Sequence, residues 1–182
     1  MQEIVTERLV LRLLQADDVP TFAAYRSDPD VARYQSWDPT YSPADGERLV
    51  AAQQDVDFGD PGPWVQVAAV DCVSGELCGD CAVRIATDQP QTAEVGVTLA
   101  PAKQRSGIAT EALAAVVTRL FEQHDIHRVY AQADDRNVPV HRLLERLGFR
   151  CEARLVEADW CKGEWATLRT YATLRREWRA GR

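Results

Sequence analysis

The feature that most constrains the fold is a change in the spacing of apolar residues near position 100. Before it, Val95, Val97 and Leu99 alternate with other residues, which is the period of a strand. After it, apolar residues recur at the three- and four-residue spacing of a helix with one buried face: Leu113, Val116, Val117 and Leu120. This change of spacing predicts a strand over 92–99 and, after a short connection, a long amphipathic helix over 105–123.

The elements on either side of this junction predict a mixed α/β protein. Upstream, the patterns give a strand, two helices and two strands: residues 3–14, 17–25, 42–57, 64–71 and 77–86. Downstream, they give a strand, a helix and two strands: residues 128–133, 140–147, 150–157 and 165–174. Ser42, Pro43 and Asp45 form the clearest helix start, with a hydroxyl cap, a proline and an acid. Because strands and helices alternate in the second half, we expect one parallel pair within the sheet.

Length and composition are those of one globular domain. At 182 residues, with 46% hydrophobic and 27% charged residues, the chain suits a single domain over 1–182. We expect residues 1–60 to form a strand and a helical cap, and residues 61–182 to form the core. No run approaches the ~20 apolar residues of a membrane helix, and Met1 to Ile4 lack the pattern of a secretory signal. We therefore expect a cytoplasmic protein with no membrane partner.

The acidic side chains are distributed unevenly along the chain, which has a net charge of −7. Residues 1–60 hold 12 acidic and 5 basic side chains, whereas residues 61–182 hold 16 of each. This balance argues against a nucleic-acid partner, because phosphate contacts need clustered Lys and Arg. The excess of acidic residues in the first third favours a cationic ligand if this part of the chain faces a ligand. The alternative is that these acidic side chains only keep the protein soluble.

The five cysteines are expected to be reduced: Cys72, Cys78, Cys81, Cys151 and Cys161. An odd number cannot all pair, and a chain of this size folds without disulfides. Cys78 and Cys81 resemble half of a zinc site, but they lie in a strand pattern, where positions three apart point to opposite faces. No second pair occurs at a matching spacing, so we expect buried structural thiols and no metal.

The residues that join the central strand to the long helix have the properties of a phosphate site. The first turn of a helix carries unpaired N–H groups and the positive end of the helix dipole. Gly107 lets an anion approach the backbone, and Ala109 keeps that approach open. A glycine at a helix start is also used where only a turn requires it, so this pattern by itself leaves both interpretations open.

Residues 104–109 read Gln-x-x-Gly-x-Ala, which resembles the Q/R-x-x-G-x-G/A signature of GNAT acetyltransferases. Asn137, which precedes a helix ending in Gly-Phe, resembles the second cofactor segment of that family. The segments Thr6 to Arg12 and Ser27 to Tyr34 resemble its Rim-type branch, which includes acetylases of ribosomal-protein N-termini. Together these segments extend in order from about residue 6 to 150.

The resemblance implies a GNAT fold, with a mixed, mainly antiparallel sheet of about six or seven strands and helices on both faces. The sheet is expected to be splayed where the cosubstrate, acetyl-CoA, enters. The pantetheine arm would lie along residues 94–99 like an added strand, and the pyrophosphate would bind N–H groups of 105–110. A backbone N–H near 97–99 would polarise the thioester carbonyl. The residues expected to bind acetyl-CoA are Val97, Thr98, Leu99, Gln104, Arg105, Ser106, Gly107, Ile108, Ala109, Thr110 and Asn137.

The implied reaction is direct attack of a primary amine on the thioester, without a covalent acyl-enzyme. A free alkylamine has a pKa near ~10, so a base or a water chain must remove its proton. Glu94 is the first candidate for the catalytic base and His141 the second. The alternatives are a solvated edge carboxylate and an exposed helix histidine. Val140 and Leu144 stand where some relatives carry Ser or Tyr near the leaving sulfur, so no side-chain acid is visible.

The acceptor is expected between the first two helices, where Tyr34 and Trp37 are the expected substrate-binding residues. They lie near Asp28, Asp30 and Asp38, and aromatic faces beside carboxylates suit a cationic amine. The alternative is that both rings pack within the helical cap. A peptide N-terminus, a polyamine and an amino-sugar antibiotic all fit this description.

Rival functions are limited by missing motifs: the sequence has no G-x-S-x-G elbow, P-loop or H-E-x-x-H. A non-catalytic module that binds or senses acyl-CoA is the alternative from another class. The basic segment 174–179 is expected to be a solvated tail. A homodimer is compatible with the resemblance.

Overall fold

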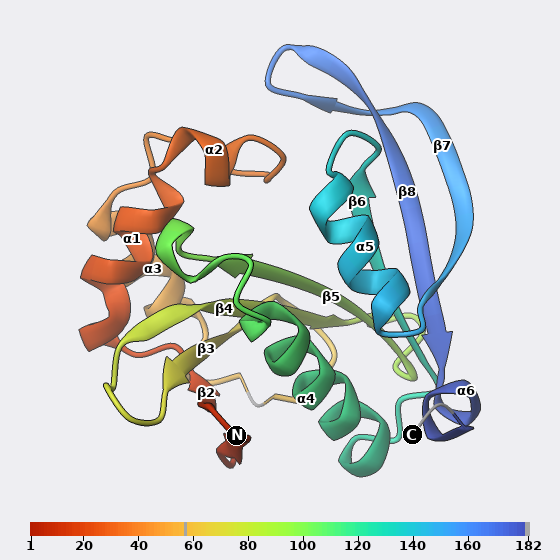
Figure 1. The fold of residues 1–182 in the computed structure, drawn as a ribbon, viewed down its shortest axis with the longest axis horizontal. Coiled ribbons are helices and arrows are strands. Elements are labelled where there is room, and N and C mark those ends of the chain that lie inside the picture. Colours follow the sequence, from red (N-terminus) through yellow and green to blue (C-terminus); the bar gives the residue numbers. More distant parts are fainter. Residues whose placement is uncertain (57, 181–182) are drawn as a thin grey trace.

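The eight strands of the described residues all belong to one sheet, in the order β1-β2-β3-β4-β5-β6-β8-β7 (Figure 1). The computed structural model describes residues 1–56 and 58–180. The strands are β1 Ile4–Val5, β2 Leu9–Leu13, β3 Val65–Asp71, β4 Leu77–Ile85, β5 Thr92–Leu99, β6 Arg128–Asp134, β7 Arg150–Cys161 and β8 Glu164–Leu174. Neighbouring strands run antiparallel except β5 and β6, which form the expected parallel pair. The expected mixed, mainly antiparallel sheet is therefore confirmed.

The sheet has one strand more than expected because the predicted strand over 3–14 is broken by a turn. Thr6 stands at this turn: its N–H donates to the carbonyl of Leu9 at 2.9 Å, and its hydroxyl accepts from the N–H of Leu9 at 3.0 Å. The chain reverses there, so that Ile4 pairs with Leu11. In β2, Leu9 and Leu11 are buried, as the alternating pattern predicts.

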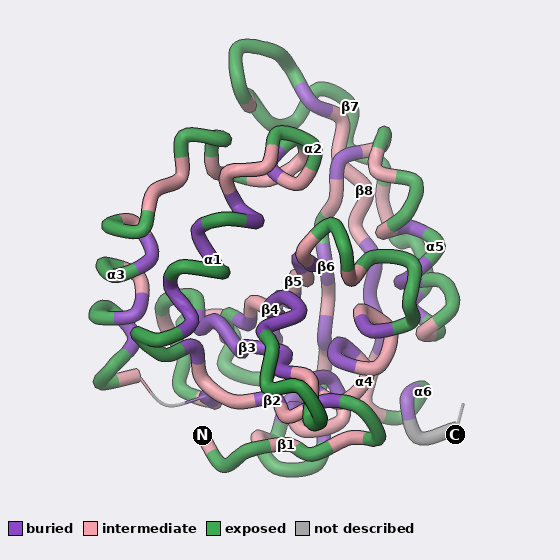
Figure 2. The backbone as a smooth tube through the Cα atoms, turned by 60° about the vertical axis from the view of Figure 1, so that its left-hand side comes forward, coloured by how far each residue is buried: buried purple, intermediate pink, exposed green. Residues whose placement is uncertain are grey.

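Helices cover both faces of the sheet, and the alternation of β3 shows which helices pack on which face. Val67 and Ala69 belong to the apolar cluster formed with α4, whereas Ala68 and Val70 belong to the cluster formed with α1 and α3. Figure 2 shows the buried strands between these two groups of helices. The α-helices are α1 Val19–Arg26, α2 Pro29–Ala32, α3 Pro43–Ala52, α4 Ile108–Gln123, α5 Val138–Arg146 and α6 Arg175–Ala180.

Helix α3 begins where the sequence predicts and ends earlier. The Ser42 hydroxyl accepts from the N–H of Asp45, and the Asp45 carboxylate accepts from the N–H of Ser42 at 2.7 Å, which is the predicted capping box. The helix ends at Ala52 because Gln53 leaves the helical conformation, with its side-chain amide donating to the carbonyl of Leu14 at 3.2 Å. The predicted end, Asp57, lies outside the described residues.

The C-terminal segment is a helix packed on the core, so the expected solvated tail is wrong. Trp178 of α6 is buried, and its indole N–H donates to the Thr118 hydroxyl of α4 at 3.2 Å. Its ring also lies against Phe121 and Phe149. The large apolar ring therefore outweighs the basic neighbours that suggested a solvated end.

The two cysteines of β4 lie in one buried cluster, which corrects the expectation that they point to opposite faces. Ala69 pairs with Gly79, and the next residue, Val70, pairs with Leu77, so Cys78 is an extra residue at a bulge. The bulge turns Cys78 to the side occupied by Cys81. Burial raises the pKa of both thiols, as expected for structural cysteines.

Candidate functional site

The parallel strands β5 and β6 separate soon after they meet. Their register covers Thr92 to Glu94 opposite Arg128 to Tyr130, although β5 continues to Leu99 and β6 to Asp134. Beyond Glu94 the edge of β5 that faces β6 pairs with no strand in the described part of the chain, and this is the splay that the resemblance implies. The separated edges create an opening in the middle of the sheet.

The backbone direction of β5 places unpaired groups in this opening. Ala86 donates to the carbonyl of Thr92 at 3.0 Å, and Ala100 donates to the carbonyl of Cys78 at 3.0 Å, both on the β4 side. Because N–H and C=O groups alternate along a strand, the even-numbered residues of β5 face β4. The N–H and C=O groups of Val95, Val97 and Leu99 therefore face the opening.

The loop from β5 to α4 presents the first turn of a helix to the same opening. Gly107 is the N-cap of α4 in the left-handed conformation, with φ +84°. The N–H groups of the first helical turn, Ile108 to Thr110, have no carbonyl four residues earlier within the helix. The Gln104 amide donates to the carbonyl of Leu99 at 3.4 Å, which ties the loop to the end of β5.

A clamp from the N-terminal strands holds this loop. Arg8 donates to the carbonyl of Ser106 at 2.9 Å and to the carboxylate of Glu111 at 2.6 Å. The Thr6 hydroxyl donates to the same carboxylate at 2.6 Å. Arg8 therefore neutralises the one acid in the first turn of α4, so the positive end of the helix is left free for an anion. The Thr6 to Arg12 motif thus has a structural role beside the loop.

Asn137 occupies the matching position on the other side of the opening, as the N-cap of α5 directly after β6. Its carbonyl accepts from the N–H groups of Val140 and His141 at 3.2 and 3.3 Å. Of the predicted cofactor residues, Val97 and Leu99 therefore stand at the open edge of β5, whereas the backbone of Thr98 faces β4. The others stand at, or just before, the two helix starts that follow the separated strands.

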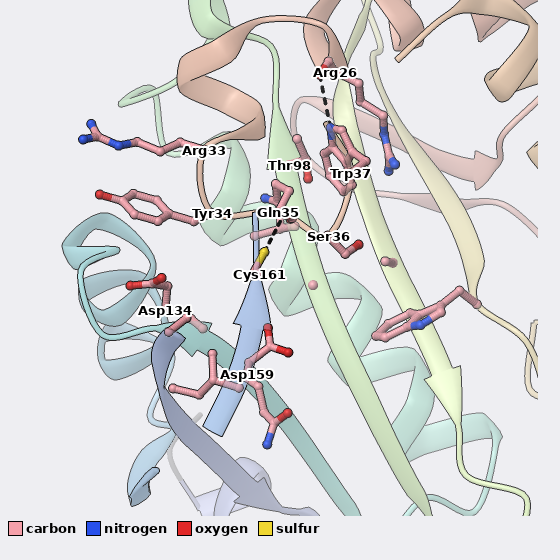
Figure 3. Close-up of a pocket in the computed structure, with 18 of the residues that line it drawn as sticks. Arg26, Arg33, Tyr34, Gln35, Ser36, Trp37, Thr98, Asp134, Asp159 and Cys161 are labelled. Atoms are coloured by element: carbon pink, nitrogen blue, oxygen red, sulfur yellow. Dashed lines mark hydrogen bonds between the residues drawn. The ribbon is translucent and has the colours of Figure 1, made fainter. Parts of the chain in front are cut away.

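A cavity of about 560 Å³ lies beside the opening (Figure 3). Its floor is the face of β4 and β5 that carries Ala82 and Gly96. These two small residues pair with each other across the strands, so no large side chain fills the centre of the cavity. One wall is the segment after α2, and the other is the tip of the β7–β8 hairpin. The structure brings five of the predicted site residues into this cavity: Tyr34, Trp37, Glu94, Val97 and Thr98.

Glu94 lines the cavity at the point where β5 and β6 separate. Its carboxylate accepts from the Tyr130 hydroxyl at 3.0 Å and from Arg84 at 2.5 Å, and its side chain is only 14% exposed. It is therefore an enclosed, hydrogen-bonded carboxylate rather than a solvated one at an edge. Burial, followed by the charge of Glu94, raises the pKa of Tyr130, which keeps the phenol protonated as a donor.

His141 lies outside the cavity lining and is buried, so the exposed helix histidine considered from the sequence is wrong. Its ring is stacked on Tyr171 with centroids 5.4 Å apart, and Nε2 lies 3.3 Å from the carbonyl of Asp135. The apolar face of α5 carries it into the core together with Leu144. The structure therefore separates the two candidate bases.

The aromatic residues of the cap line the cavity, but one face of Trp37 is already occupied. The Arg26 guanidinium lies 3.8 Å from the centroid of the Trp37 ring and 4.1 Å from that of Phe22. The Trp37 indole N–H donates to the carbonyl of Arg26 at 3.1 Å. Tyr34 has Arg33 and Arg136 over its ring at 5.5 and 5.7 Å. Both rings therefore contact the chain's own arginines.

A buried ion pair under Trp37 was missed by the sequence reasoning. Arg26 donates to the Asp80 carboxylate at 3.1 Å, and the Tyr25 hydroxyl donates to the same group at 2.5 Å. Burial, followed by the charge of Asp80, raises the pKa of Tyr25 well above its usual value. The available signal was Asp80 itself, a charged residue inside the apolar run of β4, which requires a buried partner.

The acidic residues of the first third contribute little to the cavity. Asp28, Asp30 and Asp38 do not line it, and Asp28 instead accepts from the N–H of Asp30 at the start of α2. Within the described part of the chain, no three His, Cys, Asp or Glu side chains are grouped closely enough to hold a metal ion. No helix among the described residues is long and apolar enough to cross a membrane.

Comparisons relate the chain to known proteins. The profile of a family described as an acetyltransferase (GNAT) domain matches residues 8–150. The uncharacterized N-acetyltransferase p20 of Bacillus licheniformis is 25% identical over 178 residues, which cover 98% of this chain and 99% of the relative. Spermidine N-acetyltransferase of Vibrio cholerae, solved with CoA and spermine, superposes with a TM-score of 0.82 at 20% identity, over 95% of this chain and 99% of that one. Ribosomal-protein-S5-alanine acetyltransferase of Vibrio fischeri superposes with a TM-score of 0.84 at 19% identity, over 98% and 99%.

Proposed function

This chain belongs to the GNAT acetyltransferase family, and we propose that it transfers an acetyl group from acetyl-CoA to a primary amine of a polypeptide N-terminus or a small cationic molecule. The single observation that carries this proposal is the unpaired edge of β5, where Val95, Val97 and Leu99 present backbone groups beside a cavity. These groups fit an extended, amide-containing arm that adds to a sheet edge.

The residues at the helix starts fit the remainder of acetyl-CoA. The N–H groups of Ile108 to Thr110, with Gly107 before them, suit a pyrophosphate at the positive end of α4. Asn137 stands on the opposite side of the opening and would bind the arm. When bound, acetyl-CoA supplies the acetyl group as a thioester, and the N–H of Val97 or Leu99 would polarise its carbonyl.

Glu94 is the residue we assign as the base. It lines the cavity at the end of the opening, whereas His141 of α5 is buried against Tyr171. Its carboxylate takes the proton of the acceptor ammonium, directly or through one water, while Arg84 and Tyr130 hold it in place. Trp37 and Tyr34 form the wall against which the acceptor lies.

Calorimetric titration of acetyl-CoA tests the cofactor site. Gly107→Glu should abolish binding, because the added carboxylate competes for the first turn of α4 and repels the pyrophosphate. Gly107→Ala separates backbone strain from charge, since Gly107 has a positive φ. Gly75→Glu is the matched control, because Gly75 also has a positive φ but lies at the β3–β4 turn with open space around it.

Three outcomes distinguish the hypotheses. Binding by wild type and Gly75→Glu, loss in a folded Gly107→Glu, and acetyl transfer to a peptide or diamine support the proposal. Binding without transfer to any amine identifies a non-catalytic acyl-CoA-binding module. The proposed cofactor site is rejected if folded wild type does not bind acetyl-CoA.

A further inference from the structure

Five carboxylates line the cavity, and four of them are in direct contact with an arginine. Asp80 is paired with Arg26, Glu94 with Arg84, and both Asp134 and Glu164 with Arg136. The distances between paired atoms run from 2.5 to 3.1 Å, so each pair is in direct contact. Each of these four carboxylates therefore already contacts an arginine, and of the four only Glu94 is assigned to the reacting amine.

Asp159 is the fifth, and its carboxylate has no ion pair or hydrogen bond to any residue that the structure describes. It lies on β7 opposite Ala166 of β8, and both residues line the cavity. Trp160 and Trp165 come from the opposite face of the hairpin and are exposed. Figure 3 shows Asp159 and Cys161 on the hairpin side, facing the segment that carries Ser36 and Trp37.

The hairpin is shaped to bring Asp159 over the cavity. Leu155 pairs with Leu168 and Asp159 with Ala166, so β7 has two extra residues in this stretch. Glu157, in the middle of the bulge, has a positive φ of 48°. Bulges bend a strand and redirect its side chains, and the far half of the hairpin turns toward α2 (Figure 1).

Of the four cations among the described residues that line the cavity, Arg26, Arg136 and Lys162 contact other groups and Arg33 contacts the ring of Tyr34. Lys162, at the hairpin tip, donates to the carbonyl of Ala32 in α2. Arg136 is held by two carboxylates, and Arg33 is an exposed side chain beside Tyr34. A carboxylate that lines a ligand cavity without a partner is a ready site for a ligand cation.

We propose that Asp159 determines acceptor specificity by binding one cationic group of the acceptor other than the amine that reacts. The inference rests on the proposed function, because it assumes that the cavity holds an amine beside Glu94. Glu94 lies on β5, which forms the floor of the cavity, and Asp159 lies on the hairpin wall. One acceptor must therefore carry two amino groups to use both carboxylates. The acceptor class is therefore a diamine, or a polypeptide N-terminus followed by one basic residue.

Longer polyamines fit this arrangement less well. A third ammonium held inside the cavity would meet no unpaired carboxylate, because the other four of the lining contact arginines. Asp159 provides for one further charge only.

Calorimetry on the CoA-loaded protein tests the proposal without requiring turnover. The probes are 1,4-diaminobutane and n-butylamine, which share a chain and differ in the second ammonium. Wild type should bind the diamine about fivefold more tightly, and Asp159→Asn should bind both equally, since a partly exposed ion pair is worth up to about fivefold in affinity. Glu157→Gln is the matched control, because Glu157 is an exposed carboxylate of the same strand outside the cavity lining.

Asp159→Lys adds a second, opposite measurement. It should reverse the preference and favour 4-aminobutanoate over the diamine. Equal affinity of the two probes for wild type, or a preference that survives in Asp159→Asn, overturns the proposal. CoA binding is measured first on the same samples, so a failure of the proposed function appears as lost CoA binding and is distinct from a failure of acceptor selection.

Discussion

The Tyr130 hydroxyl donates to the Glu94 carboxylate at 3.0 Å, across the last register pair before β5 and β6 separate. The two strands thus meet at the residue that we propose as the base and part immediately beyond it. The geometry of the sheet therefore fixes both the position of the carboxylate and the beginning of the opening.

Replacing Glu94 tests its role as the base. Glu94→Gln should lower kcat by about 100-fold or more, because the amide cannot take the acceptor's proton. Acetyl-CoA affinity, measured by calorimetry, should stay within twofold. Tyr130→Phe keeps the carboxylate and removes one hydrogen bond, so its loss should be much smaller. A Glu94→Gln variant with more than half of the wild-type kcat contradicts the assignment.

Breaking the buried pair beneath Trp37 should destabilise the protein strongly. Asp80→Asn leaves Arg26 charged and unpaired among aromatic rings, at a cost of about 3–5 kcal/mol. The double variant Arg26→Met/Asp80→Asn should be more stable than Asp80→Asn alone, because it leaves no buried charge. Urea unfolding of wild type, the two single variants and the double variant measures the coupling free energy between Arg26 and Asp80. If the two single changes in unfolding free energy simply add up in the double variant, the predicted coupling is contradicted.

Asp135 should make the stability depend on pH. Hydrogen bonds from Arg154 and then Arg169 lower the pKa of Asp135 to about 2. Since this lies below the unfolded value of ~3.9, the ionised carboxylate stabilises the folded state above about pH 4, and the contribution is lost as pH falls toward 2. The difference in unfolding free energy between wild type and Asp135→Asn should therefore shrink from about pH 6 to about pH 3. A difference in unfolding free energy that is constant across this pH range contradicts the prediction. Arg154→Met removes one of the two hydrogen-bonding arginines, so it should reduce the pH dependence of this difference.

Two tryptophans give a matched test of the C-terminal helix. Trp178→Ala should cost about 3–5 kcal/mol, because it opens a cavity against Phe121 and Phe149. Trp165→Ala should change stability by about 0.5 kcal/mol or less, since that ring is 57% exposed. Thermal unfolding measures both, and equal effects would show that α6 contributes no core packing.

The sequence predicted the site best where its parts are formed by residues that are neighbours along the chain. The change of period near residue 100 and the segment 104–109 predicted the β5–α4 junction, because backbone direction and helix starts are local properties. The family and the mixed sheet with an open middle followed from the same segments and are confirmed.

Contacts between distant parts of the chain could not be predicted from one sequence. Arg26 meets Asp80 across 54 positions, and Lys162 reaches Ala32 across 130. Neither spacing leaves a periodic signal. His141 looked like a surface residue because its short helix also carries Arg142, Glu145 and Arg146, and its burial against Tyr171 depends on a strand 30 positions away.

The unpaired edge of β5 also affects how its amide protons exchange with solvent. Gly96 and Thr98 direct their N–H groups toward β4, whereas Val95, Val97 and Leu99 direct theirs into the opening. In the ligand-free protein, protection along this strand should therefore alternate from one residue to the next, measured by hydrogen–deuterium exchange with NMR detection. Acetyl-CoA should slow exchange selectively at the odd-numbered positions. A single strand would then report cosubstrate binding on one edge while its other edge records the stability of the sheet.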